Sequence, residues 1–382
     1  MKQAVSEFIS KHEAKSVSEV ALLLSKNETL PKDFILNQIN GRQKAKQKFP
    51  LLVTFPNFVY PSARAVSQSS SEKTANYKAS IIPAKTVADL SGGMGLDSYF
   101  FSKQAQQSHY IEIDHDLAEI TAQNFKTLTA KNIHVHNTEA IHFLRNTNEQ
   151  FELVYIDPDR RATKEKAFRI NECEPNVAKM IPLIWKKSSL CLIKLSPMLD
   201  ISQALEELPN CKEVHVVSVD NECKEILFLL QKNFKGEPSI QCVNLKKNEK
   251  QNFTFTTQEE KDSFSSFSKP LDFLYEPNAS IMKAGAFKRI SELLNIAKLE
   301  TNTHLYTSTD LIKDFPGRTI KILDVSKPKK GLTEKANVVC RNFSQSPDAV
   351  KKKYKIKDGG TLFLYATTLE KKEKVFILGE LV

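Results

Sequence analysis

Between residues 86 and 230, short apolar runs alternate with segments of helical periodicity, and this alternation constrains the fold more than any other feature. The runs TVADL, HYIEID, IHVH, FELVYID and LCLIKL predict strands. Helices are expected between and after them, at residues 96–105, 117–128, 140–145, 176–187 and 201–208. Strands and helices in this order predict a mostly parallel sheet covered by helices on both faces.

The last two predicted strands, HVVSV and EILFLL, are separated only by DNECK. A parallel connection needs about a dozen residues or more, usually with a helix. These two strands are therefore expected to form an antiparallel hairpin. The predicted fold class is α/β, with a Rossmann-like sheet that ends in an antiparallel hairpin.

Composition excludes several classes of protein. No apolar stretch approaches the roughly 18 residues of a membrane span, and the first residues, MKQAVSEFISKHEAK, lack the apolar core of a signal peptide. The six cysteines are scattered without a CxxC pair, which predicts neither a zinc site nor a disulfide framework. We expect a cytoplasmic protein without a membrane partner or a metal.

Four regions are expected along the chain. Residues 1–80 form a helical N-terminal region, in which Ser69 and Glu72 have the spacing of a capping box. Residues 81–235 form the α/β domain. Residues 236–310 form a linker and a small α+β domain, with one helix over 284–298, and residues 311–382 form a basic α+β domain with a helix over 347–354.

The segment VADLSGGMGLD predicts a ligand-binding turn after the first strand. Asp89 ends the strand, and Gly93 and Gly95 allow a backbone that approaches a ligand closely. Ser98 stands where a dinucleotide-binding fingerprint has its third glycine, which disfavours a dinucleotide. The alternative is a turn that needs glycine for its shape alone.

Two acids follow the next strands. Glu112 lies at the carboxyl end of the second strand, where an acidic side chain can accept both hydroxyls of a ribose. Glu139, in NTEA after the third strand, could meet the amino group of an adenine. Its alternative is an ordinary acid at a helix N-terminus.

The series DLSGGMG, YIEID, NTEA and DPDRR resembles the class I S-adenosylmethionine-dependent methyltransferases over roughly residues 80–235. The segments GRQKAKQKFP, SSSEKTANYK and PGR…RNF…KDGGTLFLYATT resemble more closely the bacterial methyltransferases with a C-terminal THUMP-like domain. The resemblance implies that residues 236–310 contain a ferredoxin-like unit and that residues 311–382 are THUMP-like. It also implies S-adenosyl-L-methionine as the cofactor. The candidate cofactor-binding residues are Asp89, Ser91, Gly93, Gly95, Asp97, Glu112, Glu139 and Asp157.

The segment FELVYIDPDRR places Asp157 at the carboxyl end of the fourth strand. Amino-methyltransferases use a similar (N/D)-P-P-(Y/F/W) loop, and Asp157 and Pro158 match it. Asp159 replaces the second proline, and Arg160 replaces the aromatic residue that stacks on a base. Arg160 could instead stack its guanidinium plane on a base or hold a phosphate. These four are the candidate catalytic residues, and the alternative is a structural Asp–Arg ion-pair cluster.

The net charge of +10 is concentrated near the end of the chain, because residues 311–382 hold 16 Lys and Arg against 8 Asp and Glu. A localised basic domain predicts a polyanion partner, and a solvated lysine-rich surface is the alternative. The candidate RNA-binding residues are Arg318, Lys329, Lys330, Arg341, Lys351, Lys352 and Lys353.

THUMP domains bind RNA in RNA-modifying enzymes, so the resemblance and the charge both favour methylation of structured tRNA or rRNA. An exocyclic base amine is one candidate target. One alternative is methylation of a protein or a small molecule. The other is a non-catalytic RNA-binding protein with a vestigial cofactor pocket.

Overall fold

The computed structural model describes residues 3–25, 27, 29–160, 170, 173–247 and 249–382. The chain divides into two compact units. One unit comprises Met1–Cys211 with Leu227–Lys235, and the other comprises Lys212–Ile226 with Gly236–Val382.

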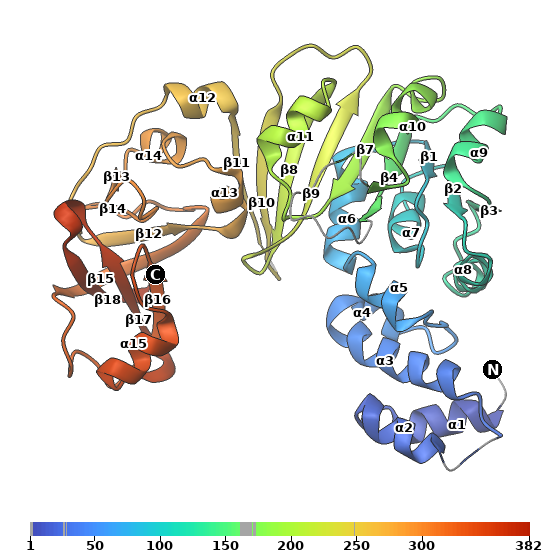
Figure 1. Ribbon diagram of the computed structural model, residues 1–382, viewed down its shortest axis with the longest axis horizontal. Coiled ribbons are helices and arrows are strands. Elements are labelled where there is room, and N and C mark those ends of the chain that lie inside the picture. The colour runs from blue at the N-terminus through green and yellow to red at the C-terminus, as the bar shows by residue number, and fades with distance from the viewer. Residues whose placement is uncertain (1–2, 26, 28, 161–169, 171–172, 248) are drawn as a thin grey trace. The chain divides into compact units, whose positions relative to one another are not determined.

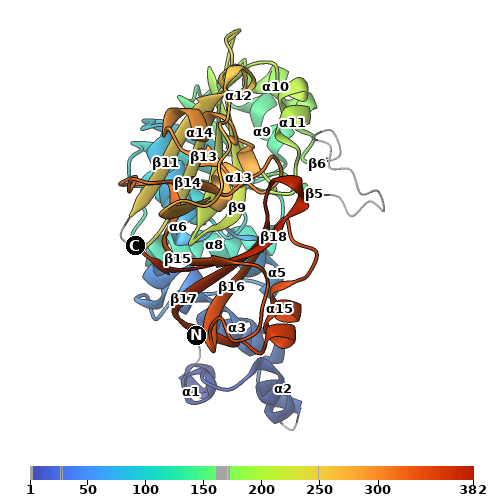
Figure 2. The same ribbon diagram turned by 90° about the vertical axis from the view of Figure 1, so that its left-hand side faces the viewer.

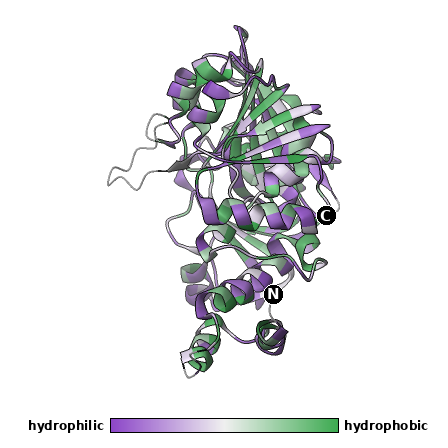
Figure 3. Cartoon of the chain, turned by 90° about the vertical axis from the view of Figure 1, so that its right-hand side faces the viewer, coloured by the Kyte–Doolittle hydropathy of each residue, from purple (hydrophilic) through white to green (hydrophobic). Residues whose placement is uncertain are grey.

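The N-terminal region of the first unit is helical, as predicted. Its core contains Val5, Ile9, Val20, Ile35 and Ile39, which alternate with polar residues at helical spacing. Figure 3 shows this amphipathic pattern as hydrophobic and hydrophilic residues side by side on the same helices. The helices are α1 (Gln3–His12), α2 (Val17–Ser25), α3 (Lys32–Lys48), α4 (Pro50–Val53), α5 (Ala63–Gln68) and α6 (Glu72–Ile81).

The predicted capping box between Ser69 and Glu72 is wrong. The box lies two residues further on, where Ser71 and Thr74 exchange side-chain and backbone hydrogen bonds at the start of α6. Ser69 instead ends α5. Glu72 accepts a hydrogen bond from the backbone N of Leu51 at 2.8 Å, and this long-range bond competes with the local one.

Five parallel strands of the first unit form the predicted Rossmann-like sheet, in the order β7-β4-β1-β2-β3 (Figure 1). All four residues of β4 are buried, as expected for a strand that is covered on both faces. Because the strands are parallel, their carboxyl ends meet at one edge, which brings together the segments after β1, β2 and β4. The bounds are β1 (Thr86–Asp89), β2 (Gln107–Glu112), β3 (Ile133–Asn137), β4 (Leu153–Ile156) and β7 (Leu190–Leu195).

Helices cover both faces of this sheet. His109 and Tyr110 are consecutive in β2 and therefore point to opposite faces. The ring of His109 packs near Phe143 of α9, and the ring of Tyr110 packs against Phe125 of α8. The helices are α7 (Leu96–Ser102), α8 (His115–Thr127), α9 (Ala140–Asn146), α10 (Val177–Ile184) and α11 (Ile201–Glu207).

The predicted antiparallel hairpin is confirmed. Strands β8 (Cys211–Val219) and β9 (Glu222–Gln231) are neighbours in the sheet order β11-β10-β8-β9-β7-β4-β1-β2-β3. Only Asp220 and Asn221 connect them, with φ angles of 49° and 67°. Two consecutive left-handed residues are typical of the tight turn that joins antiparallel strands.

The second unit contains two strands that pair next to β8 and a separate sheet. Strand β10 (Ser239–Leu245) pairs in parallel with β8, and β11 (Lys250–Thr256) pairs antiparallel with β10 before the short helix α12 (Thr257–Asp262). The other sheet has the order β13-β14-β12-β15-β18-β17-β16. Figure 2 shows its strands β15, β16, β17 and β18 on the side toward the viewer. Its strands are β12 (Phe273–Pro277), β13 (Ala297–Lys298), β14 (Tyr306–Ser308), β15 (Gly317–Ser326), β16 (Lys335–Arg341), β17 (Lys357–Thr368) and β18 (Lys374–Leu381).

The single helix expected over residues 284–298 is wrong. Gly285, at a φ of 80°, ends α13 (Ala279–Ala284), and α14 (Arg289–Leu293) follows. Only glycine adopts this left-handed conformation without strain, so the residue stops the helix. The helix expected over 347–354 is confirmed as α15 (Pro347–Tyr354). Among the helices of the described residues, none is long and apolar enough to cross a membrane.

Two buried amide side chains fix the chain segment between α4 and α5 of the helical region. Asn124 of α8 accepts from the backbone N of Val59 at 2.8 Å and donates to its carbonyl at 2.7 Å. Gln38 of α3 holds the backbone of Tyr60 in the same way, at 2.9 and 2.8 Å. The segment is therefore fixed from both sides.

Replacing Asn124 by Ala should lower the free energy of unfolding by about 1–3 kcal/mol, because two partly buried backbone groups of Val59 would be left without a partner. Urea unfolding at neutral pH measures the difference. The exposed neighbour Gln123 is the matched control, and Gln123→Ala should leave the stability near wild type. Equal stability of the two variants would contradict the role given to Asn124.

Candidate functional site

In the turn after β1, both predicted glycines adopt a backbone conformation that favours glycine. Gly93 and Gly95 have φ angles of 55° and 78°. A Cβ on Gly95 would lie 2.5 Å from Thr121 and 2.7 Å from Phe125, so larger residues do not fit. The backbone N of Gly93 donates to Glu112 at 2.8 Å, which ties the turn to the end of β2. The shape of the turn thus requires glycine whether or not a ligand is bound.

Asp89 is 1% exposed and ends β1 beneath this turn. The Ser98 hydroxyl donates to one carboxylate oxygen at 2.6 Å, and the backbone N and hydroxyl of Ser91 donate to the other. Burial raises the pKa of Asp89 to about 7, with a further contribution from nearby Asp97, although the bond from Ser98 opposes the shift. Ser98, which departs from the dinucleotide fingerprint, therefore anchors the acid at the end of the strand.

Glu112 and Glu139 lie in the positions predicted for them, with different surroundings. The carboxylate of Glu112 accepts from the backbone N of Gly93 at 2.8 Å and from that of Asp114 at 2.9 Å, one bond to each oxygen. Each oxygen keeps a lone pair that can accept from a hydroxyl. Glu139 is exposed at the start of α9 and makes no capping hydrogen bond with its side chain.

Asp157 follows β4 and faces the turn. Its backbone N donates to the hydroxyl of Ser91 at 2.7 Å, and Lys194 of β7 forms an ion pair with its carboxylate. Burial raises the pKa of Asp157, and the ion pair with Lys194 opposes this shift only in part. Pro158 is buried. Asp159 and Arg160 form the short strand β5 (Asp159–Arg160), paired with β6 (Cys173–Glu174), and their side chains lie outside the described residues.

A buried ion pair joins α6 of the helical region to the site. The Lys78 side chain is 0% exposed, and its ammonium lies 3.3 Å from the Asp97 carboxylate in α7. Ser70 and the Tyr155 hydroxyl also donate to Asp97, at 2.8 and 2.9 Å. Burial acts to raise the pKa of Asp97, but Lys78 and Lys194 outweigh it and hold the pKa below its ordinary value.

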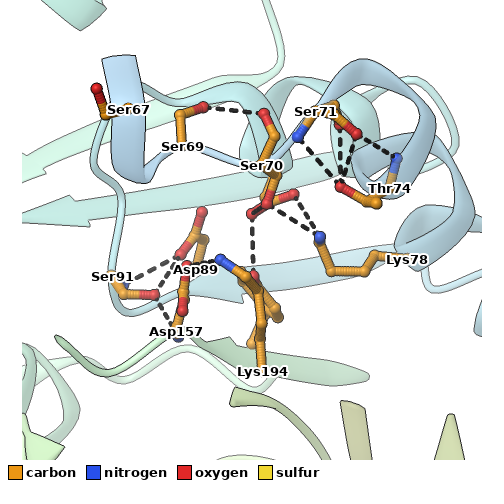
Figure 4. Close-up of polar contacts among 12 residues, drawn as sticks. Ser67, Ser69, Ser70, Ser71, Thr74, Lys78, Asp89, Ser91, Asp157 and Lys194 are labelled. Carbon is orange, nitrogen blue, oxygen red and sulfur yellow. Dashed lines mark hydrogen bonds and ion pairs between the residues drawn. The ribbon is translucent and has the colours of Figure 1, made fainter. Parts of the chain in front are cut away.

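These contacts form one network of three carboxylates and two ammonium groups. Figure 4 shows Lys78 and Lys194 reaching the network from different elements, near Asp89 and Asp157. Counted over the described residues, the network is one positive charge short when every group is ionised, and a buried charge without a counter-charge is costly. The pKa of Asp89 near 7 relieves part of this cost. A cationic ligand would complete the charge balance.

Sequence reasoning placed Asp89, Asp97 and Asp157 in the site but did not predict the pairing of Lys78 with Asp97. Lys78 lies in the polar segment SSSEKTANYK, before the first strand. The structure buries Tyr77, Lys78 and Ala79 in a short helix of low overall hydrophobicity, which the sequence does not indicate. Only the three-dimensional partner explains why a lysine is buried there.

The seven predicted RNA-binding residues differ in their surroundings. Arg318 and Arg341 both form ion pairs with Glu276, and Lys351 pairs with Asp348 and Asp358. The other four side chains belong to exposed residues, which are Lys329, Lys330, Lys352 and Lys353.

Family models match three parts of the chain. Residues 55–180 match the model described as "Conserved hypothetical protein 95", residues 273–316 match a ferredoxin-like domain, and residues 319–380 match a THUMP domain-like model. A crystal structure of a "putative methyltransferase" from Porphyromonas gingivalis W83 is 29% identical, with a TM-score of 0.89, and the match covers 99% of this chain and 98% of that one. In these parts the chain resembles the class I methyltransferases with a C-terminal THUMP-like domain.

Two other solved structures match only part of this chain. A "putative methyltransferase yhhF" from Escherichia coli is 19% identical, with a TM-score of 0.33 and coverage of 45% of this chain and 89% of that one. TrmK from M. capricolum in complex with S-adenosyl-homocysteine is 15% identical, with a TM-score of 0.33 and coverage of 42% and 69%. Similarities this low carry no functional argument. No curated protein matches the sequence.

Replacing Lys78 by Met should lower the free energy of unfolding at pH 7 by about 3–5 kcal/mol, because Asp97 stays buried without this partner. Lys78 helps to hold the pKa of Asp97 low. The wild type therefore loses the stabilisation from this ion pair only as the pH falls through the lowered pKa of Asp97. In the variant Asp97 protonates at a higher pH, so the difference in the free energy of unfolding between variant and wild type should shrink between pH 7 and about pH 4.

Urea unfolding at the two pH values measures this difference. Lys85→Met, which removes an exposed lysine four residues beyond α6, is the matched control. If Lys78→Met lowers the free energy of unfolding equally at both pH values, the assigned pairing with Asp97 is contradicted.

Proposed function

We propose that this chain is an S-adenosylmethionine-dependent methyltransferase that acts on RNA. The observation that carries the proposal is the network at the carboxyl edge of the sheet, where three carboxylates face two lysines. In open α/β sheets ligands bind at this edge. S-adenosylmethionine carries a sulfonium, an ammonium and a carboxylate group and is a net monocation, so its charge suits a site that is one cation short among the described residues.

The residues around the glycine turn fit this cofactor. Glu112 has lone pairs left for the two ribose hydroxyls, and Asp89 with the turn at Gly93 would hold the methionyl end. Ser91, Gly95 and Asp97 shape the turn, and Glu139 would accept from the adenine amino group. The cofactor would supply the methyl group. Metal ions have no part in the proposal.

Asp157 and Pro158 would position the methyl acceptor. Methyl transfer is an in-line displacement, so the protein acts mainly by orienting the nucleophile. The carboxylate of Asp157 can accept a hydrogen from an amine on the acceptor, and the ion pair with Lys194 favours its ionised form against the effect of burial. Asp159 and Arg160 would complete the loop, with Arg160 in place of the usual aromatic residue.

RNA is the proposed substrate because the THUMP-like part is basic and presents exposed lysines. Positive charge recognises phosphates without sequence preference. A cytoplasmic tRNA or rRNA would present both the phosphates and the base. Methylation of a protein or small molecule is the second candidate, because the carboxylate of Asp157 suits any amine.

Incubation of the purified protein with methyl-labelled cofactor and either total RNA or total protein tests the proposal. Label in an RNA fraction, removed by ribonuclease, is the expected result. Label confined to protein would select the second candidate. Failure of the cofactor to raise the thermal unfolding midpoint would favour an RNA-binding protein with a vestigial pocket.

Replacing Asp157 by Ala should reduce methyl transfer about 100-fold or more, because the variant has no side-chain oxygen that accepts a hydrogen from the acceptor. Cofactor affinity should stay near wild type, because the backbone N of residue 157 still bonds Ser91. Initial rates with labelled cofactor, together with calorimetry, measure both quantities. Asp116→Ala, which changes a 96% exposed aspartate, is the control and should retain activity. An Asp157→Ala protein with wild-type turnover would remove Asp157 from the mechanism.

Replacing Lys352 and Lys353 together by Ala should flatten the salt dependence of RNA binding. Each phosphate that the variant no longer neutralises should reduce the slope of log K against log salt by about 0.7–0.9. Affinity for a structured RNA, measured at several salt concentrations, gives the slope. Lys32→Ala with Lys46→Ala removes the same charge from exposed positions of α3 and is the control. Identical slopes for both double variants would place the docking surface elsewhere.

A further inference from the structure

Two arginines from different strands meet on one buried carboxylate in the second unit. Glu276 of β12 has a side chain that is 4% exposed, and one of its oxygens accepts from Arg318 at 2.8 Å and from the Tyr365 hydroxyl at 2.8 Å. The other oxygen accepts from Arg341, whose Nε and Nη2 lie 2.9 and 2.6 Å away. The carboxylate is thus fully occupied on both oxygens.

The sheet must curl for these contacts to form. Arg318 of β15 lies directly opposite Glu276 in the strand register. Arg341 belongs to β16, and β15, β18 and β17 stand between β16 and β12. At about 4.8 Å per strand, a flat sheet would separate Arg341 from Glu276 by roughly 19 Å. The observed contact therefore places the cluster on the concave face of a strongly curled sheet.

The arginines hold more charge and more donors than Glu276 can satisfy. Two guanidinium groups face one carboxylate, and within the described part of the chain no other carboxylate forms an ion pair with either arginine. Arg318 uses Nη1, and Arg341 uses Nε and Nη2, which leaves N–H groups on both. Their side chains are 31% and 43% exposed, so these groups reach solvent although the carboxylate does not.

The guanidinium groups are also fixed in orientation. Arg318 lies over the ring of Phe363, with its central carbon 4.9 Å from the ring centroid, and shares the Tyr365 hydroxyl with Glu276. Arg341 is held by two of its nitrogens. A side chain already held in place loses little conformational entropy when a ligand binds. Planar arginine forks match the oxygens of a phosphate.

We propose that Arg318 and Arg341, held by Glu276, form a binding site for a phosphate group of the RNA substrate. That the phosphate belongs to RNA rests on the proposed function. The exposed lysines, in contrast, add positive charge without donors at fixed positions. Each arginine offers directed donors at a fixed place, so the site would set the register of the RNA on the domain.

Titration of the full-length protein with inorganic phosphate, followed by calorimetry at low ionic strength, tests the site directly. Wild type should bind phosphate saturably. Arg341→Lys and Arg318→Lys keep the charge but remove the fork, and each should weaken phosphate binding about tenfold, as expected when one charge-assisted hydrogen bond is removed. The Lys352→Ala, Lys353→Ala double variant is the control and should bind inorganic phosphate like wild type.

A short RNA separates the directed from the diffuse contribution. Arg341→Lys should weaken RNA binding with little change in the salt slope, since the charge remains, and the lysine double variant should change the slope. An unchanged thermal unfolding midpoint for Arg341→Lys shows that the sheet is intact.

Absence of saturable phosphate binding, or wild-type phosphate affinity in both arginine variants, would overturn the site. The proposed function fails separately. A protein that binds phosphate through these arginines but methylates no RNA would overturn the function and leave the site. If the protein methylates RNA but the arginine variants bind phosphate as well as wild type does, the site is overturned and the proposed function stands.

Discussion

The buried ion pair between Lys78 and Asp97 is the interaction on which the candidate site depends. Asp97 lies in the first turn of the helix that follows the glycine turn, and Lys78 comes from the last helix of the N-terminal region. Neither charge is stable alone in such surroundings. The helical region is therefore part of the site's construction, and the amides of Gln38 and Asn124 strengthen the same connection from the backbone side.

The sequence predicted the features that local periodicity and loop length determine. The strands followed from apolar runs, and the hairpin at Asp220 and Asn221 followed from a connection too short for a helix. The errors arose where several local solutions compete. A run of serines offers more than one capping residue, and the choice of Ser71 over Ser69 depends on the distant bond from Leu51 to Glu72.

The site was predictable in part for the same reason. Asp89, Glu112 and Asp157 stand at strand ends, where the topology alone brings them to one edge. Lys78 could not be assigned to them, because its partner is fixed by the packing of α6 on α7. Glu276 was also missed, because it meets Arg341 only through the curl of the sheet. Long-range pairing of this kind leaves no periodic signal in the sequence.

Both sites have an unequal number of opposite charges, and the imbalance differs in sign. Among the described residues, the network around Asp157 has three carboxylates for two lysines, and the cluster around Glu276 has two arginines for one carboxylate. An unbalanced buried or half-buried charge favours a ligand of the opposite sign, because the ligand restores pairing that these residues leave incomplete. A cationic methyl donor and a polyanionic acceptor are the two ligands that RNA methylation requires. The two imbalances are thus those that the proposed reaction needs, and this agreement rests on charges within each unit alone.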